Sequence, residues 1–277
     1  MARGSENQAS PARALQSRQV ENGILLAIPP AEYKSLLPHL EFVDLQMHQV
    51  LHDSGEKIEY GFFLNSGLAS LLVVTRDARS VEVGVVGKEG FLGTPLATGI
   101  RESSQRAIIQ APAGAFRVKS EVLENILSSS PRLQYWLNRF VLVQGLQTAQ
   151  LAACNRLHEI DQRLARWLLM SHDRVGSDSL PITHDLLSQM LGSGRPSVTV
   201  AAGALQRAGI IEYTRGVVKI LNRIALENAA CECYAVIRRI TALNGVTPAS
   251  AASLAKLAER KSKSRKSPRI TRVVEKE

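Results

Sequence analysis

Cysteine is scarce in this 277-residue sequence, and long apolar runs are missing from it. The three cysteines, Cys154, Cys231 and Cys233, form an odd set, which argues against a disulfide scaffold and favours a reducing cytoplasm. No apolar stretch approaches the roughly 20 residues that a membrane-spanning helix needs, so we expect no membrane partner. The polar first 22 residues lack the apolar core of a secretory signal, and we expect a cytoplasmic protein.

Acidic residues are fewer than basic ones, and most of the difference lies at one end of the chain. The formal net charge is +9, and residues 256–277 supply much of it with nine Lys/Arg against three Asp/Glu. A basic run of this kind is typical of a solvated tail, which attracts phosphate without sequence preference. Overall basicity is therefore weak evidence for a nucleic-acid partner.

No arrangement of residues suited to catalysis appears in the sequence. Gly84 to Lys88 superficially resembles a phosphate-binding loop, but its spacing is wrong and no Ser or Thr follows the lysine. Cys231 and Cys233 form an incomplete metal-ligand set without a second pair, and we interpret them as a structural helix end, with a thiol switch as the lesser alternative. We therefore expect no enzyme, no catalytic residues, no metal and no cofactor.

The residues from 40 to 119 show a β-type pattern. Short runs such as Gly61–Leu64 and Val81–Val86 alternate or cluster apolar residues, and glycine-containing turns separate them. Regular short strands of this kind predict a closed or sandwiched β unit rather than alternating strands and helices.

A long helix is predicted after this β unit. Ser130 and Pro131 form a good helix start, and apolar residues then recur at spacings of three to five over about seven turns. One small β unit does not easily cover so long a stripe, so we expect a second copy to cover half of it. Packing within the chain is the alternative, and beyond Gly145 we favour dimerisation. The expected dimer residues are Leu133, Trp136, Leu137, Phe140 and Leu151.

The sharpest local pattern runs from residue 180 to residue 220. Thr183 is suited to cap a helix over His184–Met190, and Gly192 follows where a tight turn between helices needs a positive φ angle. A second helix opens around Pro196 and ends at Gly209, and a β-hairpin follows it. Helix, glycine turn, helix and hairpin in this order predict a winged helix-turn-helix, although the helix pair alone would also fit a small helical bundle.

A winged helix-turn-helix suits double-stranded DNA, because a helix fits the major groove and its N-terminal side chains reach base edges. We expect Arg195 to contact a base, and Arg215 and Lys219 to hold the flanking backbone. The full set of predicted DNA-binding residues is Thr183, Arg195, Pro196, Ser197, Thr199, Val200, Arg215 and Lys219.

The segment from Ile182 to Val198 resembles the helix-turn-helix signature of the Crp/Fnr family of bacterial transcription regulators. Asp161 to Leu169 is similar to the linking helix of that family, and the turns at 55–57, 65–67 and 90–93 match turns of its cyclic-nucleotide-binding-like β-roll. The resemblance covers roughly residues 24–235. It implies an α+β fold with an N-terminal antiparallel β-roll of the double-stranded β-helix type, a long dimerisation helix and a C-terminal winged helix-turn-helix.

The resemblance also implies an order of domains along the chain. We expect a flexible arm (1–22), a sensor (23–130), a dimerisation helix (131–158), a DNA-binding domain (159–235) and a basic, disordered tail (236–277).

Departures from the family pattern concern the ligand. Family members that bind cyclic AMP carry Glu where Thr94 stands here, and Arg-Ser where Gln105 and Arg106 stand. A neutral Gln does not replace a guanidinium on phosphate, so we predict no control by cyclic AMP and leave an unknown small-molecule effector open. The residues placed at this pocket are Phe91, Leu92, Gly93, Thr94, Gln105 and Arg106. The cysteine cluster of oxygen-sensing members is also missing, because no cysteine precedes Cys154.

The sequence thus predicts a homodimeric transcription regulator that binds a two-fold operator, and the resemblance implies RNA polymerase as a further partner. The alternative is a ligand-binding signalling module whose helix-turn-helix contacts proteins. Arg195, Ser197, Thr199 and Arg215 on the expected groove-facing side favour DNA.

Overall fold

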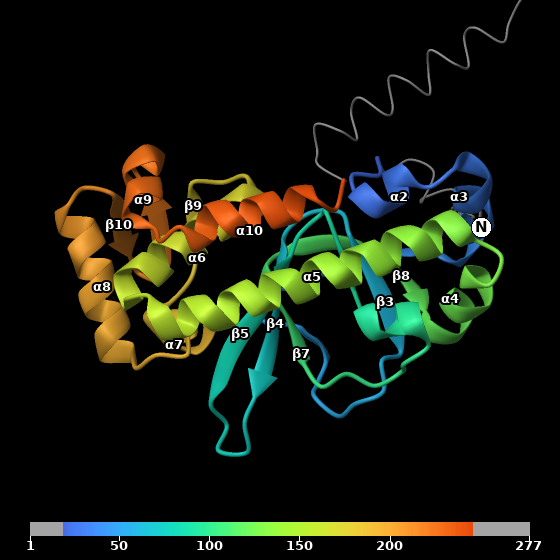
Figure 1. Ribbon diagram of the computed structural model, residues 1–277, viewed down its shortest axis with the longest axis horizontal. Coiled ribbons are helices and arrows are strands. Elements are labelled where there is room, and N and C mark those ends of the chain that lie inside the picture. The colour runs from blue at the N-terminus through green and yellow to red at the C-terminus, as the bar shows by residue number, and fades with distance from the viewer. Residues whose placement is uncertain (1–18, 246–277) are drawn as a thin grey trace, which may run out of the picture.

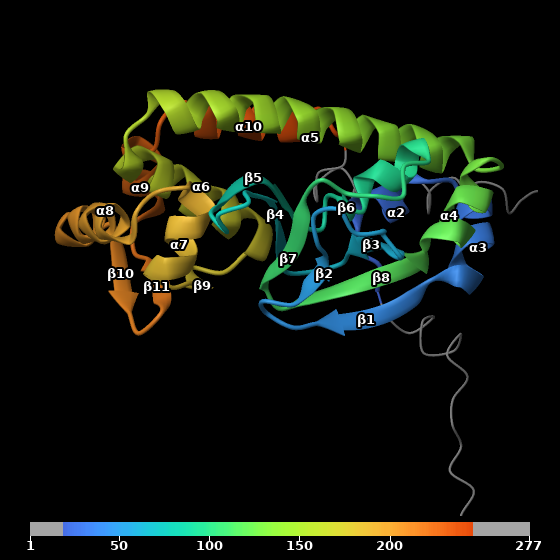
Figure 2. The same ribbon diagram turned by 90° about the horizontal axis from the view of Figure 1, so that it is seen from below.

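A computed structural model describes residues 19–245, which form two lobes along one long helix, α5 (Pro131–Leu157). Figure 1 shows the β-rich lobe at one end of α5 and the mostly helical lobe at the other. Figure 2 shows α5 lying across both lobes. In this part of the chain no helix is long and apolar enough to span a membrane.

The N-terminal lobe is a roll of two antiparallel four-stranded sheets. The first sheet has the order β1 (Glu41–Leu45), β8 (Ala113–Lys119), β3 (Tyr60–Leu64) and β6 (Phe91–Leu92). The second has the order β2 (Val50–His52), β7 (Arg106–Ala111), β4 (Leu68–Val74) and β5 (Ser80–Val86). Phe63, Phe91 and Phe116 are fully buried in its core.

Short helices cover the ends of this roll. They are α2 (Gly23–Ala27), α3 (Pro30–Leu36), η1 (Leu37–His39), η2 (Thr94–Thr98) and α4 (Ser120–Leu127). Asn22 caps α2, and its side-chain amide also donates to Leu64 O and Gly90 O at 2.8 Å each. Because Asn22 is buried, these bonds tie the start of the described chain to the roll.

The C-terminal lobe begins directly after α5. Its elements are α6 (Ile160–Val175), β9 (Ser179–Pro181), α7 (His184–Leu191), α8 (Arg195–Arg207), β10 (Ile211–Thr214), β11 (Val217–Ile220), α9 (Arg223–Ala229) and α10 (Cys233–Ala242). Glu159 and Gln162 form a capping box that starts α6. The fold class predicted from the sequence, an antiparallel β-roll, a long helix and a winged helix-turn-helix, is confirmed.

Most of the residues predicted above to form a dimer contact on α5 are instead buried within their own chain. Leu133, Leu137 and Phe140 belong to the core of the β-roll, and Leu151 belongs to the core of the C-terminal lobe. Trp136 is partly buried and donates from Nε1 to Ala27 O at 3.2 Å. The spacing correctly marked an apolar face, but the two lobes of one chain are together long enough to cover it.

The C-terminal end of the lobe also differs from the prediction. Residues 236–242, assigned above to a disordered tail, continue the helix α10. Tyr234 and Ile237 are buried in the core of the lobe, and α10 packs along α5. The predicted arm and the rest of the predicted tail fall, apart from residues 19–22 and 243–245, outside the described residues.

Polar side chains join the two lobes. Trp167 on α6 donates from Nε1 to Glu82 on β5 at 3.0 Å, and Ser70 donates to the same carboxylate at 2.5 Å. Arg174 pairs with Glu89 at 2.7 Å with both side chains largely buried. A buried ion pair contributes less net free energy than its distance suggests, but it fixes geometry, so these contacts orient the C-terminal lobe on the β-roll.

Candidate nucleic-acid interface

The helix-turn-helix consists of α7 and α8 and the turn between them. Thr183 accepts a hydrogen bond at Oγ1 from Leu186 N at 3.2 Å and so caps α7. Gly192 ends α7 with φ of 56°, in the left-handed region that favours glycine. Pro196 lies in the first turn of α8, where its missing N–H costs no helical hydrogen bond. Together these residues produce the sharp turn between α7 and α8.

One face of α8 packs inward and the opposite face is exposed. Val198, Ala201, Ala202 and Leu205 are buried against the lobe. All eight residues predicted to contact DNA are exposed: Thr183, Arg195, Pro196, Ser197, Thr199, Val200, Arg215 and Lys219. Val200 is 69% exposed although it is apolar, so nothing in the described chain covers the outer face of the helix.

The wing is a tight hairpin beside α8. Thr214 pairs with Val217, which leaves a two-residue turn in which Arg215 and Gly216 both have positive φ, 47° and 82°. The hairpin strand β11 also pairs with β9, and Lys219 lies on its exposed side. Gln206 accepts a hydrogen bond from Tyr213 N at 2.9 Å and thus connects α8 to the wing.

The electrostatics of the exposed end of α8 centre on Arg195. Its guanidinium lies 3.1 Å from the Asp185 carboxylate, and both side chains are more than 60% exposed. Burial, then the nearby Arg195 charge, lower the pKa of His184, which favours its neutral form. His184 stacks on Tyr213 at 4.1 Å between ring centroids and lies 3.1 Å from Thr199 Oγ1.

The β-roll touches the turn of the helix-turn-helix. A Cβ added to Gly192 would lie 2.9 Å from Val81 Cγ2 on β5, so the turn approaches that strand closely. A cavity of about 600 Å³ lies beside this contact, lined by residues of the β4–β5 hairpin such as Arg79 and by turn residues such as Ser193. A displacement of β5 would therefore reach α7 and α8 directly.

Comparison with known proteins agrees with this geometry. Residues 162–229 match the family of Crp-like helix-turn-helix domains. The chain is 24% identical to the global nitrogen regulator of Synechocystis sp. over 182 residues, which cover 62% of this chain and 80% of that protein. Residues 162–229 are thus a Crp-like helix-turn-helix domain.

Solved structures of transcription regulators show the same fold as this chain. A transcriptional regulator of the Crp/Fnr family from Eubacterium rectale superposes with a TM-score of 0.61 at 18% identity, covering 73% of this chain and 94% of that one. The c-di-GMP responsive global regulator CLP of Xanthomonas campestris gives 0.59 at 16% identity, covering 69% and 99%. The matching proteins are transcription regulators rather than enzymes.

The residues predicted to line an effector pocket in the β-roll do not all meet at one cavity. Thr94 and Gln105 line a cavity of about 720 Å³ between the 94–105 segment and α5, where Thr94 Oγ1 donates to Gln144 Oε1 at 3.1 Å. Glu102 is the only charged residue among the described lining residues.

The other four predicted pocket residues have structural roles. Phe91 and Leu92 are fully buried in the core, where Phe91 packs on Phe63 at 4.7 Å, and Gly93 forms the positive-φ start of η2. Arg106 pairs with Asp53 at 2.6 Å, away from the cavity lining. Gln105 precedes β7 and lines the cavity, whereas Arg106 is the first residue of β7 and does not.

Sequence reasoning also missed residues at both surfaces. His184 and Tyr213 support Thr199 and the wing, and Gln144 and Thr148 of α5 line the cavity beside Thr94. In both cases the contact is between elements that are far apart in the sequence, so no local motif indicates these residues.

Proposed function

We propose that this regulator binds double-stranded DNA sequence-specifically as a homodimer, with α8 in the major groove and the wing on the adjacent backbone. The observation that carries the proposal is the exposed face of α8, which presents Arg195, Ser197 and Thr199 beside Arg215 and Lys219. Arg is the side chain best suited to pair with guanine O6 and N7, and the wing cations suit phosphate. We also propose that the regulator acts in the cytoplasm and contacts RNA polymerase.

The uncovered side of α5 is the proposed dimer face. Tyr135, Leu142, Leu146 and Leu157 are exposed apolar residues of this helix, and Leu142 is 64% exposed. Gly145 lies on the same side, and a Cβ added there would meet nothing within 4 Å. Apolar residues with a glycine between them allow a second copy of the helix to approach closely, so we assign this side to the partner protomer.

The effector cavity does not suit a cyclic phosphate. Its described lining offers hydroxyl and amide groups from Thr94, Gln105 and Gln144 and carries the negative charge of Glu102, without a guanidinium. An anionic phosphate in this cavity would lose its water of hydration without gaining a cationic partner, and this loss of hydration would oppose binding. We therefore propose that cyclic AMP does not control this protein, and that any effector of the cavity is an uncharged or cationic molecule rich in hydrogen-bonding groups.

The proposed function is tested by selection from a pool of random DNA duplexes with the full chain, followed by sequencing of the retained DNA. We expect a two-fold symmetric motif whose half-sites are centred about 10 bp apart or a multiple of that, as helix-turn-helix dimers require. Retention without a shared motif, or no retention by folded protein, would refute it. The second outcome would favour the alternative in which the helix-turn-helix contacts proteins.

A further inference from the structure

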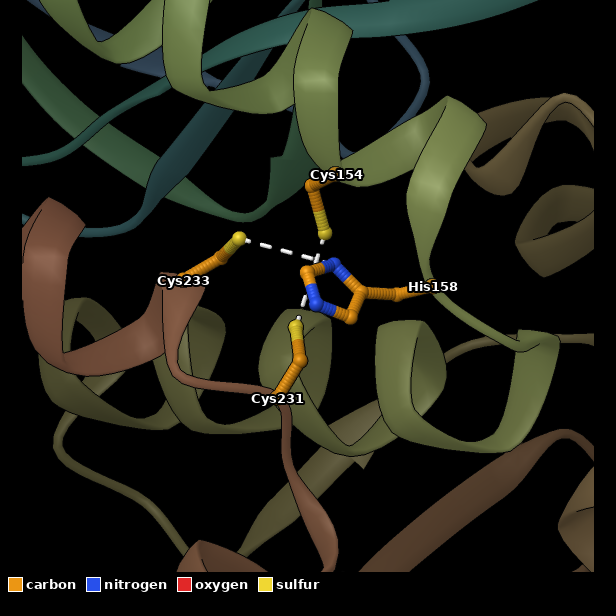
Figure 3. Close-up of side chains that lie close together, drawn as sticks. All are labelled: Cys154, His158, Cys231 and Cys233. Carbon is orange, nitrogen blue, oxygen red and sulfur yellow. Dashed lines mark hydrogen bonds between the residues drawn. The ribbon is translucent and has the colours of Figure 1, made fainter.

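All three cysteines of the chain meet one histidine where α5 ends and α10 begins. Cys154 and His158 are one helical turn apart at the end of α5, while Cys231 and Cys233 lie just before and at the start of α10. Figure 3 shows the three sulfur atoms arranged around the imidazole ring of His158. Their four ligand atoms all lie within 4.8 Å of one another.

The spacing of these atoms suits a tetrahedral ion. The Sγ atoms of Cys154 and Cys231 are 3.5 Å apart, and Cys233 Sγ lies 3.6 Å from His158 Nδ1. In a tetrahedral zinc site, bonds of about 2.3 Å to sulfur and about 2.0 Å to nitrogen place neighbouring ligand atoms about 3.5–3.8 Å apart. These two separations therefore already match the geometry of the ion, and the other ligand atoms lie within 4.8 Å of one another.

The histidine is oriented by a carboxylate. His158 Nε2 lies 3.1 Å from the Glu232 carboxylate, and Nδ1 faces the cysteines. A proton held on Nε2 by this carboxylate leaves the lone pair of Nδ1 directed at the sulfur atoms, which is the common arrangement behind a metal-bound histidine. Glu232 thus acts as a positioning residue.

The surroundings favour a negatively charged set of ligands. Arg163 and Arg166 on α6 are buried, and neither forms a salt bridge with a carboxylate within residues 19–245. Arg166 acts electrostatically on Cys154, and Arg163 on Cys154 and Cys231. Three thiolates around a divalent ion give a net charge of −1, which these buried cations balance.

We propose that Cys154, His158, Cys231 and Cys233 bind one zinc ion in each protomer. Three thiolates and one imidazole fill all four positions of a tetrahedral ion, so the site is structural, with no position left for substrate. On binding, the thiol protons are released to solvent and no electrons are transferred. The ion joins the end of α5 to the start of α10 across 77 residues of sequence, and so fixes the C-terminal lobe to the long helix.

Metal analysis of the full chain, purified under reducing conditions from zinc-supplemented cells, tests the proposal. We expect about one zinc per protomer, and loss of the zinc in Cys231→Ser, Cys233→Ser and His158→Ala. The exposed His39 is remote from the site in sequence and fold, so His39→Ala is the matched control and should keep the zinc. Iron with acid-labile sulfide in place of zinc would overturn the proposal.

Cobalt titration of the chelator-treated wild type gives a test that does not depend on variants folding. One equivalent of Co²⁺ should produce the visible bands of tetrahedral cobalt and a near-ultraviolet band from thiolate ligation, and zinc should abolish both. If no bands appear and all three thiols react freely in the folded protein with excess zinc, the cluster is not a zinc site. The same result followed by a Cys154–Cys231 disulfide on mild oxidation would assign it as a thiol switch.

Glu232→Gln tests the orienting carboxylate. We expect zinc affinity, measured by competition with a chelator, to fall about 10-fold while one zinc still binds at saturation, as for other partners of metal-bound histidines. An unchanged affinity would show that Glu232 does not position His158.

Discussion

Arg195 is held on the protein surface by a weak interaction. Its ion pair with Asp185 joins two side chains that are both mostly exposed, and exposed pairs contribute only about 0–1 kcal/mol. In the proposed complex, DNA therefore has only a weak ion pair to displace when it contacts the guanidinium. Lys219, by contrast, lies on the wing, where a point charge without fixed hydrogen-bond geometry suits a phosphate.

Arg195→Ala and Lys219→Ala should consequently have different effects. We expect Arg195→Ala to cost about 1–3 kcal/mol on the best operator and to relax preference at one base position per half-site. Lys219→Ala should weaken all duplexes alike and reduce the salt dependence by about one phosphate contact. Binding to matched and mismatched duplexes over a salt series measures both. An equal loss on every sequence for Arg195→Ala would make it a phosphate contact.

The ionisation of the buried Glu82 should make the stability of the protein depend on pH. Burial raises its pKa from 4.5 to about 7, although hydrogen bonds from Ser70 and Trp167 and the charges of Arg166 and Arg174 act in the opposite direction. The folded protein thus binds this proton more tightly than the unfolded chain does. Its free energy of unfolding should fall as pH rises from about 4.5 to about 7, and this contribution should be constant outside that range.

Glu82→Gln should remove this pH dependence. The amide keeps polar atoms within reach of Ser70 and Trp167 but does not ionise, so we expect a gain of up to about 3 kcal/mol over wild type above pH 7 and little difference below pH 4.5. Urea unfolding at several pH values measures it, with the exposed Glu59→Gln as control. A slope shared by wild type and Glu82→Gln would show that another group titrates.

Among the elements, the turn between α7 and α8 has the strictest requirement. Gly192 and Gly176 both end helices with positive φ, 56° and 69°, but only Gly192 approaches another element, the strand β5. An added Cβ at Gly176 would meet nothing within 4 Å. The pair therefore separates backbone strain from the contact between the sensor and the helix-turn-helix.

Gly176→Ala should cost roughly 1–2 kcal/mol, the penalty of the left-handed conformation alone. Gly192→Ala should cost more, because its Cβ would also press on Val81, and Val81→Ala should restore part of the difference. Chemical unfolding of the two single variants and the double variant measures these terms. Equal costs at the two glycines would mean that the turn moves freely away from β5.

Elements with local signals were predictable from the sequence, and contacts between distant elements were not. Thr183, Gly192 and Gly209 mark the helix-turn-helix within a few residues of the features they control, and the fold class followed. Whether the chain itself or a second copy covers the apolar face of α5 depends on whether the two lobes together are as long as that helix. This comparison requires the folded structure. The proposed zinc site joins Cys154 to Cys231, which are 77 positions apart. The sequence therefore showed the ligands of α5 and those before α10 as two separate groups, and nothing in it indicated that they meet.

At the scale of the whole molecule, α5 has one face in the core of the chain and one face that none of residues 19–245 covers. The buried face includes Phe140, so a charge placed there would disrupt folding before it affected assembly. The open face includes Leu142 and Leu146, where a charge costs little in a lone protomer. Variants on the two faces thus separate loss of folding from loss of association.

The double variant Leu142→Glu, Leu146→Glu should be a folded monomer if this face joins two protomers. Four like charges would face each other across the two-fold axis, and each would lose its water of hydration there. Sedimentation should give a dimer for wild type and a monomer for the variant, with near-unchanged circular dichroism. Ile224→Glu, which changes a still more exposed apolar residue on α9, should remain dimeric. A wild type that sediments as a monomer, or a variant that stays dimeric, would exclude this face as the interface.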